Sequence, residues 1–324
     1  MSVTKHKQSC ILVLIITLFL ISISLSLTLG IYTFSLSDLW SFITQDDASK
    51  AALVFWELRL PRLFIAVLGG ASLATAGFLM QSIVKNPLAS PNLTGVMSGS
   101  ALMVLSAIMF QLPLSSLFWG IAGGLAGGVL TLSVSWKNGV TPARLALAGI
   151  SVSAFCQAMV TFILLSGHVD SEALFFWLTG SNAGASWQAF WPLLFTVVPM
   201  LFLLILSFRQ RAYLELDDDV ARGLGIAINW YRLMFGLIAV ILTAASVGAF
   251  GPVGFIGLVA PHVSRMLGFG ISGAAIIGAL LVVCADFLSR TLMMPLEIPI
   301  GVLTALIGAP WFLYLIIKKI RAFS

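Results

Sequence analysis

Histidine and cysteine, the side chains that most often carry catalysis or bind metal ions, are few in this chain. They are His6, His168, His262, Cys10, Cys156 and Cys284. None of them forms the CxxC, CxH or HExxH spacing of zinc sites and metalloproteases. No lysine follows a glycine, so the chain lacks the Walker A motif GxxxxGK[ST] that holds ATP phosphates. We therefore expect no catalytic residue, no metal site and no ATP hydrolysis by this chain.

Three arginines, Arg59, Arg62 and Arg290, have the chemistry to bind carboxylates, because the planar guanidinium group offers a fork of donors. Arg59 and Arg62 share a face if a helix begins at the proline between them. Two interpretations are open from the residues alone. The arginines bind acidic groups on a partner, or they extend to lipid headgroups and pair with Glu57 and Asp286.

Asp286 and Glu297 are acidic residues next to long apolar runs. Ion-coupled carriers usually hold an ionisable residue in the middle of the membrane, where a charge is costly and is kept for function. Both acids here lie near the ends of apolar runs. This argues against coupling by a buried acid, and an ion-coupled secondary transporter stays an alternative.

The composition places most of the chain in lipid. Of its 324 residues, 60% are hydrophobic and 9% are charged, whereas about 25% are charged in an ordinary globular protein. A bilayer core about 30 Å thick needs roughly 20 apolar residues per helical crossing. Uncharged stretches of this kind are residues 11–30, 63–83, 93–110, 114–136, 145–167, 190–208, 233–250, 271–285 and 300–317. We predict an all-α, polytopic membrane protein with a single transmembrane domain over residues 1–324.

The distribution of Lys and Arg predicts the number of crossings. Residues 251–270 form a further apolar segment. If this segment also crosses and the N-terminus is cytoplasmic, most basic residues fall on the cytoplasmic side, as the positive-inside rule requires. These residues are Lys5, Lys7, Lys85, Lys137, Arg144, Arg209, Arg211, Arg222, Arg232, Arg265, Lys318, Lys319 and Arg321. We therefore predict about ten helices with both termini cytoplasmic. The net charge of +5 then reflects topology and not a nucleic acid partner.

Glycine and proline patterns predict local packing. In GGLAGG, Gly123 with Gly127 and Gly124 with Gly128 form two GxxxG spacings, which allow helices to approach closely. Two Pro/Gly-rich segments, KNPLASPNLTG and GPVGFIGLVAPH, each follow an apolar run and resemble the helix breaks of transporters. The piece LFFWLTG is too short to span and is expected to lie at the outer interface.

Residues 209–232, which read RQRAYLELDDDVARGLGIAINWYR, form the longest inner connection. An acidic cap, an apolar side and terminal glycines indicate a short helix here. The cap is Asp217 or Asp218, the apolar side is formed by Val220 and Leu224, and the terminal glycines are Gly223 and Gly225. The alternative is a solvated loop. We favour a helix that docks on a cytoplasmic protein, because a pump without its own motor needs a rigid contact to one.

Several long strings resemble the iron-siderophore and vitamin B12 permeases of ABC importers. They are LRLPR at 58–62, GASLATAGFLMQSIVKNPLASPNLTGV at 70–96, LALAGI at 145–150, LFFWLTGS at 174–181, GPVGFIGLVAPHVSRML at 251–267 and LEIPIGVLTALIGAPWFLYLI at 296–316. The ending GAPWFLYLI is especially similar to the ferric dicitrate members, which favours iron chelates over cobalamin or haem.

This resemblance implies the type II ABC-importer permease fold in a bacterial cytoplasmic (inner) membrane. It implies a second permease subunit, identical or homologous, with the transport path between the two. Two separate ATPase subunits that bind ATP and Mg²⁺ would dock on the cytoplasmic side. A periplasmic or lipoprotein substrate-binding protein would dock on the outer side.

The resemblance also assigns roles to residues. Arg59, Arg62 and Arg290 align with arginines that meet acidic residues of the binding protein. The coupling helix that contacts the ATPase aligns with Asp217, Asp218, Val220, Arg222, Gly223, Leu224 and Gly225. The cytoplasmic gate aligns with Thr141, Pro142 and Ala143, although Pro142 and Ala143 differ from the small hydroxylated residues of the family. The inner loop GFGIS is also shorter than the polar, basic loop usual there.

Overall fold

The computed structural model describes residues 5–44, 49–135, 142–166 and 171–321, and every regular element in these ranges is a helix. In chain order the elements are α1 (Lys5–Thr28), α2 (Leu36–Thr44), α3 (Lys50–Leu53), η1 (Val54–Arg59), α4 (Leu60–Val84), η2 (Pro91–Thr94), α5 (Val96–Met109), α6 (Ser116–Ser135), α7 (Pro142–Leu165), α8 (Ser171–Leu178), α9 (Trp187–Leu206), α10 (Phe208–Arg211), η3 (Ala212–Glu215), α11 (Asp218–Gly223), α12 (Ile228–Phe250), α13 (Ile256–Leu267), α14 (Gly270–Thr291) and α15 (Ile300–Arg321). The all-α prediction is confirmed.

Each apolar stretch predicted from the sequence coincides with a helix. Seven helical spans within the described ranges are long and apolar enough to cross a membrane: α1, the continuous run of α3, the π-helix η1 and α4, then α6, α7, α9, α12 and α14. α5 and α13 have only 14 and 12 residues, which is about 21 and 18 Å at the rise of an α-helix. The number of crossings and the side on which the termini lie remain predictions.

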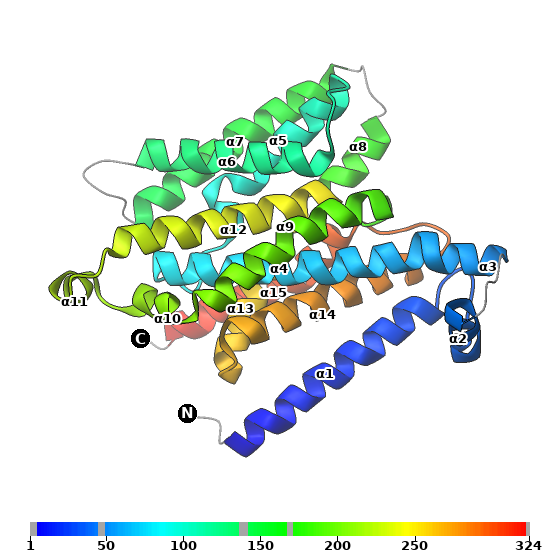
Figure 1. Ribbon diagram of the computed structural model, residues 1–324. Coiled ribbons are helices and arrows are strands. Elements are labelled where there is room, and N and C mark those ends of the chain that lie inside the picture. The colour runs from blue at the N-terminus through cyan, green and yellow to red at the C-terminus, as the bar shows by residue number, and fades with distance from the viewer. Residues whose placement is uncertain (1–4, 45–48, 136–141, 167–170, 322–324) are drawn as a thin grey trace.

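The helices form one elongated bundle, and both ends of the chain lie at the same end of it (Figure 1). α10 and α11 lie at this end, which we call the inner end because the charge distribution predicts that it faces the cytoplasm. α2, α3 and α8 lie at the opposite end, which we call the outer end.

α4 lies at the centre of the bundle, where it packs against α9, α12, α13 and α14. Glycines make this packing close. A methyl group added at Gly77 would lie 1.8 Å from the backbone oxygen of Gly257 on α13, and one at Gly70 would lie 2.4 Å from that of Gly278 on α14. These positions exclude any side chain, because the facing atoms belong to the backbone.

The predicted GxxxG spacing in α6 also acts in packing. A methyl group at Gly123 would lie 2.3 Å from the backbone oxygen of Gly99 on α5, and one at Gly127 would lie 2.4 Å from that of Gly95. The hairpin of α5 and α6 is therefore held by backbone-to-backbone contact, as small residues permit inside membranes.

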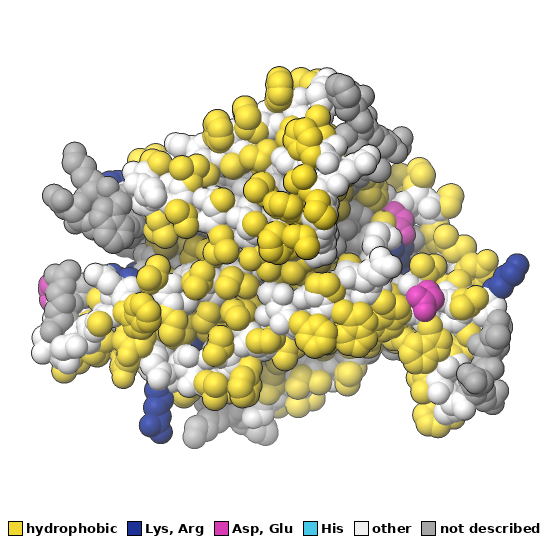
Figure 2. Space-filling model, turned by 45° about the horizontal axis from the view of Figure 1, so that its top comes forward, with side chains coloured by type: hydrophobic (Ala, Val, Ile, Leu, Met, Phe, Trp, Pro, Cys, Tyr) yellow, Lys and Arg dark blue, Asp and Glu magenta, His cyan; other side chains and the backbone are white. Residues whose placement is uncertain are grey.

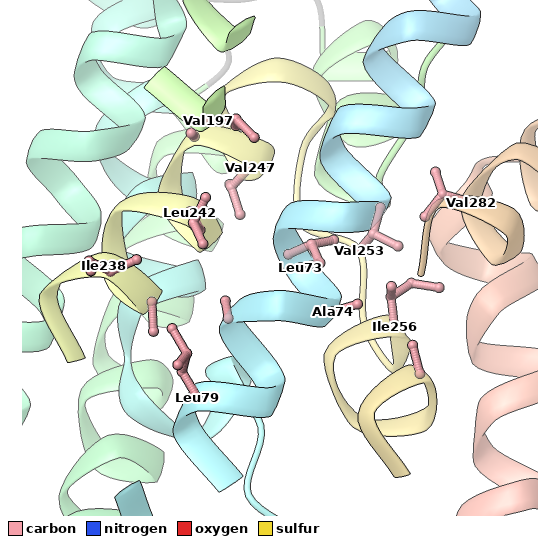
Figure 3. Packing of buried hydrophobic residues seen from close by; sticks show 14 of the residues in the cluster. Leu73, Ala74, Leu79, Val197, Ile238, Leu242, Val247, Val253, Ile256 and Val282 are labelled. Atoms are coloured by element: carbon pink, nitrogen blue, oxygen red, sulfur yellow. The ribbon is translucent and has the colours of Figure 1, made fainter. Parts of the chain in front are cut away.

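Aliphatic side chains fill the space between the central helices (Figure 3). Those labelled there come from α4, α9, α12, α13, α14 and the segment before α13: Leu73, Ala74, Leu79, Val197, Ile238, Leu242, Val247, Val253, Ile256 and Val282. All are at most 6% exposed. The core is thus continuous across segments that are far apart in the sequence.

Many large apolar side chains are exposed on the surface of the bundle. In Figure 2 hydrophobic side chains cover most of the visible face, and most of the visible charged side chains lie toward its two ends. α1 is an extreme case, since only 17% of its apolar window is buried although its mean hydropathy is 2.9. A surface of this kind is stable in lipid and not in water.

The two Pro/Gly-rich segments that follow α4 and α12 meet inside the bundle. A small cavity between them is lined by residues of both, including Ser90, Pro91, Val253 and Phe255. Phe255, immediately before α13, has a φ of 67° and so adopts the left-handed conformation. α5 and α13 therefore both begin at one interior junction, and irregular backbone of this kind is tolerated in a membrane protein where protein buries it.

Candidate functional site

Arg62, on the first turn of α4, forms the centre of a charged cluster near the outer end. Its Nε donates to Asp286 of α14 at 2.8 Å, and its Nη1 and Nη2 donate to the two carboxylate oxygens of Glu297 at 3.0 and 2.9 Å. Asp286 is 1% exposed, whereas the Glu297 side chain is 30% exposed. The guanidinium of Arg62 therefore joins three segments through two carboxylates.

The other two arginines of the predicted docking set lie beside this cluster. Arg59 donates to the backbone oxygens of Leu27 and Tyr32, at the end of α1 and just after it. Arg290 donates to the backbone oxygen and hydroxyl of Ser26 at 2.8 and 2.7 Å. Both guanidinium groups thus satisfy backbone carbonyls that the end of α1 leaves without helical partners.

The structure brings Arg59, Arg62 and Arg290 together, but it directs them inward. Arg59 is 6% exposed, and the side chains of Arg62 and Arg290 are 12% and 11% exposed. The pairing with Asp286 that the sequence suggested is present, because Arg290 Nε also lies 3.4 Å from this carboxylate. The suggested pairing with Glu57 is not found among the described residues, since that side chain is exposed on the surface of η1.

Two neutral residues that sequence reasoning missed complete the cluster. The Asn182 amide donates to the backbone oxygen of Arg62 at 2.9 Å and to Asp286 Oδ1 at 3.2 Å. Ser289 lies 3.5 Å from Arg62 Nη2. Their partners are more than 100 residues away, so no local pattern could have identified them.

A cavity of about 860 Å³ opens at the outer end between α5, α6, α8, α9 and α12. Phe176 and Trp177 of α8 line one side, as expected for the short LFFWLTG piece at the outer mouth. Among the residues that the structure describes, the lining also contains hydroxyl and amide side chains, including Ser181, Ser186 and Gln188, and none of these described lining residues is charged. This described part of the lining fits a neutral or apolar group.

The inner connection contains the predicted short helix. α11 runs from Asp218 to Gly223, and the backbone of Gly225 has a φ of 70°, which turns the chain towards α12. Val220 and Leu224 are 51% and 66% exposed. Added methyl groups at Gly223 and Gly225 would meet no atom within 4 Å. The helix thus offers an apolar, sterically open surface at the inner end.

α11 is fixed to the bundle from its other side. Ala221 and Leu214 are 0% and 1% exposed. Lys85, just after α4, donates to the backbone oxygen of Leu216 at 2.7 Å and lies 3.9 Å from the Asp217 carboxylate. The side chains of Asp218 and Arg222 lie outside the described set. These contacts connect the α11 region directly to the central helix α4.

The predicted gate is described only in part. Thr141 lies outside the described residues, and α7 begins at Pro142, followed by Ala143, whose side chains are also outside the described set. Proline in this place is compatible with a helix start, because the first turn has no helical acceptor for its missing N–H group.

Arg265, near the inner end of α13, ties this short helix to α4. Its Nη1 donates to Gln81 Oε1, and its Nη2 donates to the Phe78 backbone oxygen at 3.2 Å and to the Ser82 hydroxyl at 3.1 Å. Its guanidinium carbon also lies 4.1 Å from the centre of the Phe78 ring. The positive-inside rule places Arg265 on the cytoplasmic side but does not predict these contacts.

Replacing Arg265 tests this connection. We expect Arg265→Met to lower the stability of the protein by about 2 kcal/mol, because hydrogen bonds to a charged group contribute about 1.5–3 kcal/mol and methionine keeps the apolar stem. The measurement is the thermal unfolding midpoint in detergent. Lys7→Met, also near the inner end, removes a cation that makes no such contacts with the described residues, and it is the control. Equal midpoints for the two variants would contradict the role of Arg265.

The comparison with known families decides the identity of this bundle. The profile of the FecCD transport family matches residues 17–318, which is nearly the whole chain. The chain belongs to the FecCD transport family. The resemblance inferred from the sequence strings is therefore confirmed, and this chain is a transport permease.

Individual relatives and a solved structure are similar to this chain over most of its length. The chain is 38% identical over 294 residues to the Fe(3+)-citrate import system permease protein YfmD of Bacillus subtilis, with 88% of each chain covered. It is 40% identical over 277 residues to the Fe(3+) dicitrate transport system permease protein FecD of Escherichia coli, covering 82% of this chain and 85% of that one. A solved structure of a metal-chelate type ABC transporter in an inward-facing conformation matches with a TM-score of 0.81 and 33% identity, covering 96% of this chain and 99% of the other.

Proposed function

We propose that this FecCD permease is the membrane-spanning subunit of an ABC importer that brings an iron(III) chelate, a citrate complex or a siderophore, across the cytoplasmic membrane. The observation that carries the proposal is the similarity, over 88% and 82% of this chain, to two permeases of ferric citrate import. Cobalamin is the alternative substrate, because a vitamin B12 import permease of Serratia proteamaculans is 35% identical over 303 residues. Haem is a further alternative.

Separate ATPase subunits supply the energy in this proposal. Two ATPases with bound ATP and Mg²⁺ act on the inner end of a pair of permease subunits, identical or homologous. α11 is the contact, because its apolar side is exposed while its opposite side is fixed to α4. Closure of the ATPases is then transmitted to the central helix. Residues 141–143 narrow the path at this end.

The outer end receives the substrate-binding protein in this proposal, and the charged cluster sets a condition for docking. The guanidinium of Arg62 is already occupied by two carboxylates of this chain. Acidic groups of a binding protein must therefore displace Glu297, the more exposed carboxylate, or reach Arg59 and Arg290 after a rearrangement. A paired, inward-directed cluster fits a resting state in which the outer side is closed.

Uptake of defined chelates tests the substrate. We expect a strain whose only iron-chelate permease is this protein, with its natural partner subunits, to take up ⁵⁵Fe as ferric citrate or as a ferric siderophore. Deletion of the permease should abolish that uptake. Uptake of labelled cobalamin with no uptake of any iron chelate would establish the alternative. Uptake into vesicles by the isolated chain on a proton gradient, without ATP, would instead identify a secondary transporter.

A further inference from the structure

The helix α2 has an apolar surface that the described part of the chain does not cover. Leu36, Trp40 and Ile43 are 69%, 70% and 60% exposed. Because they are four and three residues apart in an α-helix, they point in nearly the same direction. Large apolar side chains exposed together in this way usually mark a contact surface.

The opposite side of α2 is packed inside the protein. Phe42 is 7% exposed, and its ring lies 5.4 Å from that of Phe34 and 5.7 Å from that of Phe55. The Trp56 indole donates to the Phe42 backbone oxygen at 3.1 Å. The helix thus has two apolar sides, of which the protein buries one.

The start of α2 is fixed by reciprocal capping. The Ser35 amide donates to the Asp38 carboxylate at 2.8 Å, and the Asp38 amide donates to the Ser35 hydroxyl at 3.1 Å. Hydrogen bonds from Ser35 hold the pKa of Asp38 below its usual range. The carboxylate is therefore charged at neutral pH, and the helix is held on its polar side by a cap that water can reach.

The position of α2 indicates what covers the stripe. α2 lies at the outer end beside the end of α1 and runs across the direction of the long helices (Figure 1). The lipid-facing side chains of α1 continue towards it through Leu29, Ile31 and Tyr32, which are 39%, 75% and 57% exposed. A helix parallel to the membrane plane, with an exposed tryptophan at the end of a lipid-facing span, fits the headgroup boundary.

We propose that α2 is an interfacial anchor that inserts Leu36, Trp40 and Ile43 into the outer leaflet of the bilayer. The anchor also positions one arginine of the charged cluster. Phe34, which packs against Phe42 of α2, stacks on the Arg59 guanidinium at 4.2 Å. α2 therefore contacts the same Phe34 ring that stacks on Arg59.

Spin labels report what covers each side of α2. Cys10→Ser first removes the exposed native thiol, since Cys156 and Cys284 are buried or half-buried. Leu36→Cys, Trp40→Cys and Ile43→Cys are then labelled one at a time with a nitroxide in the full chain, reconstituted in phosphatidylcholine and phosphatidylglycerol vesicles. Ser37→Cys, on the exposed polar side of α2, is the matched control.

We expect the three apolar positions to show high collision rates with oxygen and low rates with the water-soluble nickel complex NiEDDA, and position 37 to show the reverse. NiEDDA rates at position 40 as high as at position 37 would show that water covers the stripe and would overturn the proposal. Low rates with both reagents at position 40 would show that protein covers it, a second copy or another chain, and would also overturn it.

A second measurement leaves the apolar side intact. Lipids brominated near the headgroup should quench tryptophan fluorescence of the unmodified protein, and Trp40→Phe should remove a measurable part of that quenching. Trp230→Phe, a 63% exposed tryptophan at the inner end, is the control in vesicles brominated only in the outer leaflet. Equal quenching in Trp40→Phe and the parent protein would overturn the proposal.

Discussion

Asp286→Asn should destabilise this protein by about 3 kcal/mol and reduce transport to a small fraction of its normal rate. Removing one partner of a buried ion pair costs about 3–5 kcal/mol, because the other charge is left in a medium of low dielectric constant. Asp286 is 1% exposed and serves both Arg62 and Arg290, so its loss affects two cations at once. The measurements are the unfolding midpoint in lipid nanodiscs and the rate of chelate uptake.

Glu297→Gln is the matched control, since it also replaces a carboxylate partner of Arg62 by an amide. Its side chain is 30% exposed, and Arg62 keeps Asp286. We expect a loss of less than about 1 kcal/mol, as for partly exposed pairs. A midpoint for Asp286→Asn equal to that of Glu297→Gln would show that the buried carboxylate does not hold the cluster together.

Glu297→Gln also distinguishes a role of Arg62 in docking the binding protein from a purely structural role. If the binding protein uses Arg62, Glu297→Gln should raise its affinity for the permease, because an internal competitor for the guanidinium is weakened. If the arginines serve only the fold, the affinity should not change. Charge reversal of Arg59, Arg62 and Arg290 would be less informative, because these side chains are buried and reversal would disrupt folding.

Changing the exposed side of α11 should abolish ATP-driven uptake while leaving the fold intact. Val220→Asp combined with Leu224→Asp introduces two charges on side chains that are 51% and 66% exposed. The stability of the isolated permease should therefore change little. At an interface with the ATPase the same charges would be desolvated, which costs several kcal/mol. The complex should therefore lose its ATPase subunits on purification, and uptake should fall to background.

The α11 variant needs a control at the inner end that leaves α11 unchanged. Arg209→Asp with Arg211→Asp, on α10 at the same end, changes more charge while leaving α11 intact. We expect this variant to keep its ATPases. An ATPase content and uptake rate of the α11 variant equal to those of the parent protein would refute the coupling role.

The sequence by itself determined the class of the protein and the approximate place of each long helix. Hydropathy predicts these helices because a helix in lipid must be apolar over its whole crossing. The pattern lies within one segment, so it can be recognised without knowing which helices pack against that segment. The helix at α11 was also predictable, since its acidic start, apolar residues and glycines lie within a few positions of one another. Family membership followed from long strings and not from the physics of single residues.

Only the tertiary structure decided which polar groups meet. Arg62 is separated by 224 residues from Asp286 and by 235 from Glu297, and the sequence could equally place the arginines in contact with Glu57 or with a partner. It likewise could not show that the α4 and α12 breaks share one junction, or that α2 leaves Trp40 uncovered. Apolar periodicity is weak when both the core and the surroundings are apolar, so helix faces in a membrane are assigned by packing between distant segments rather than by pattern.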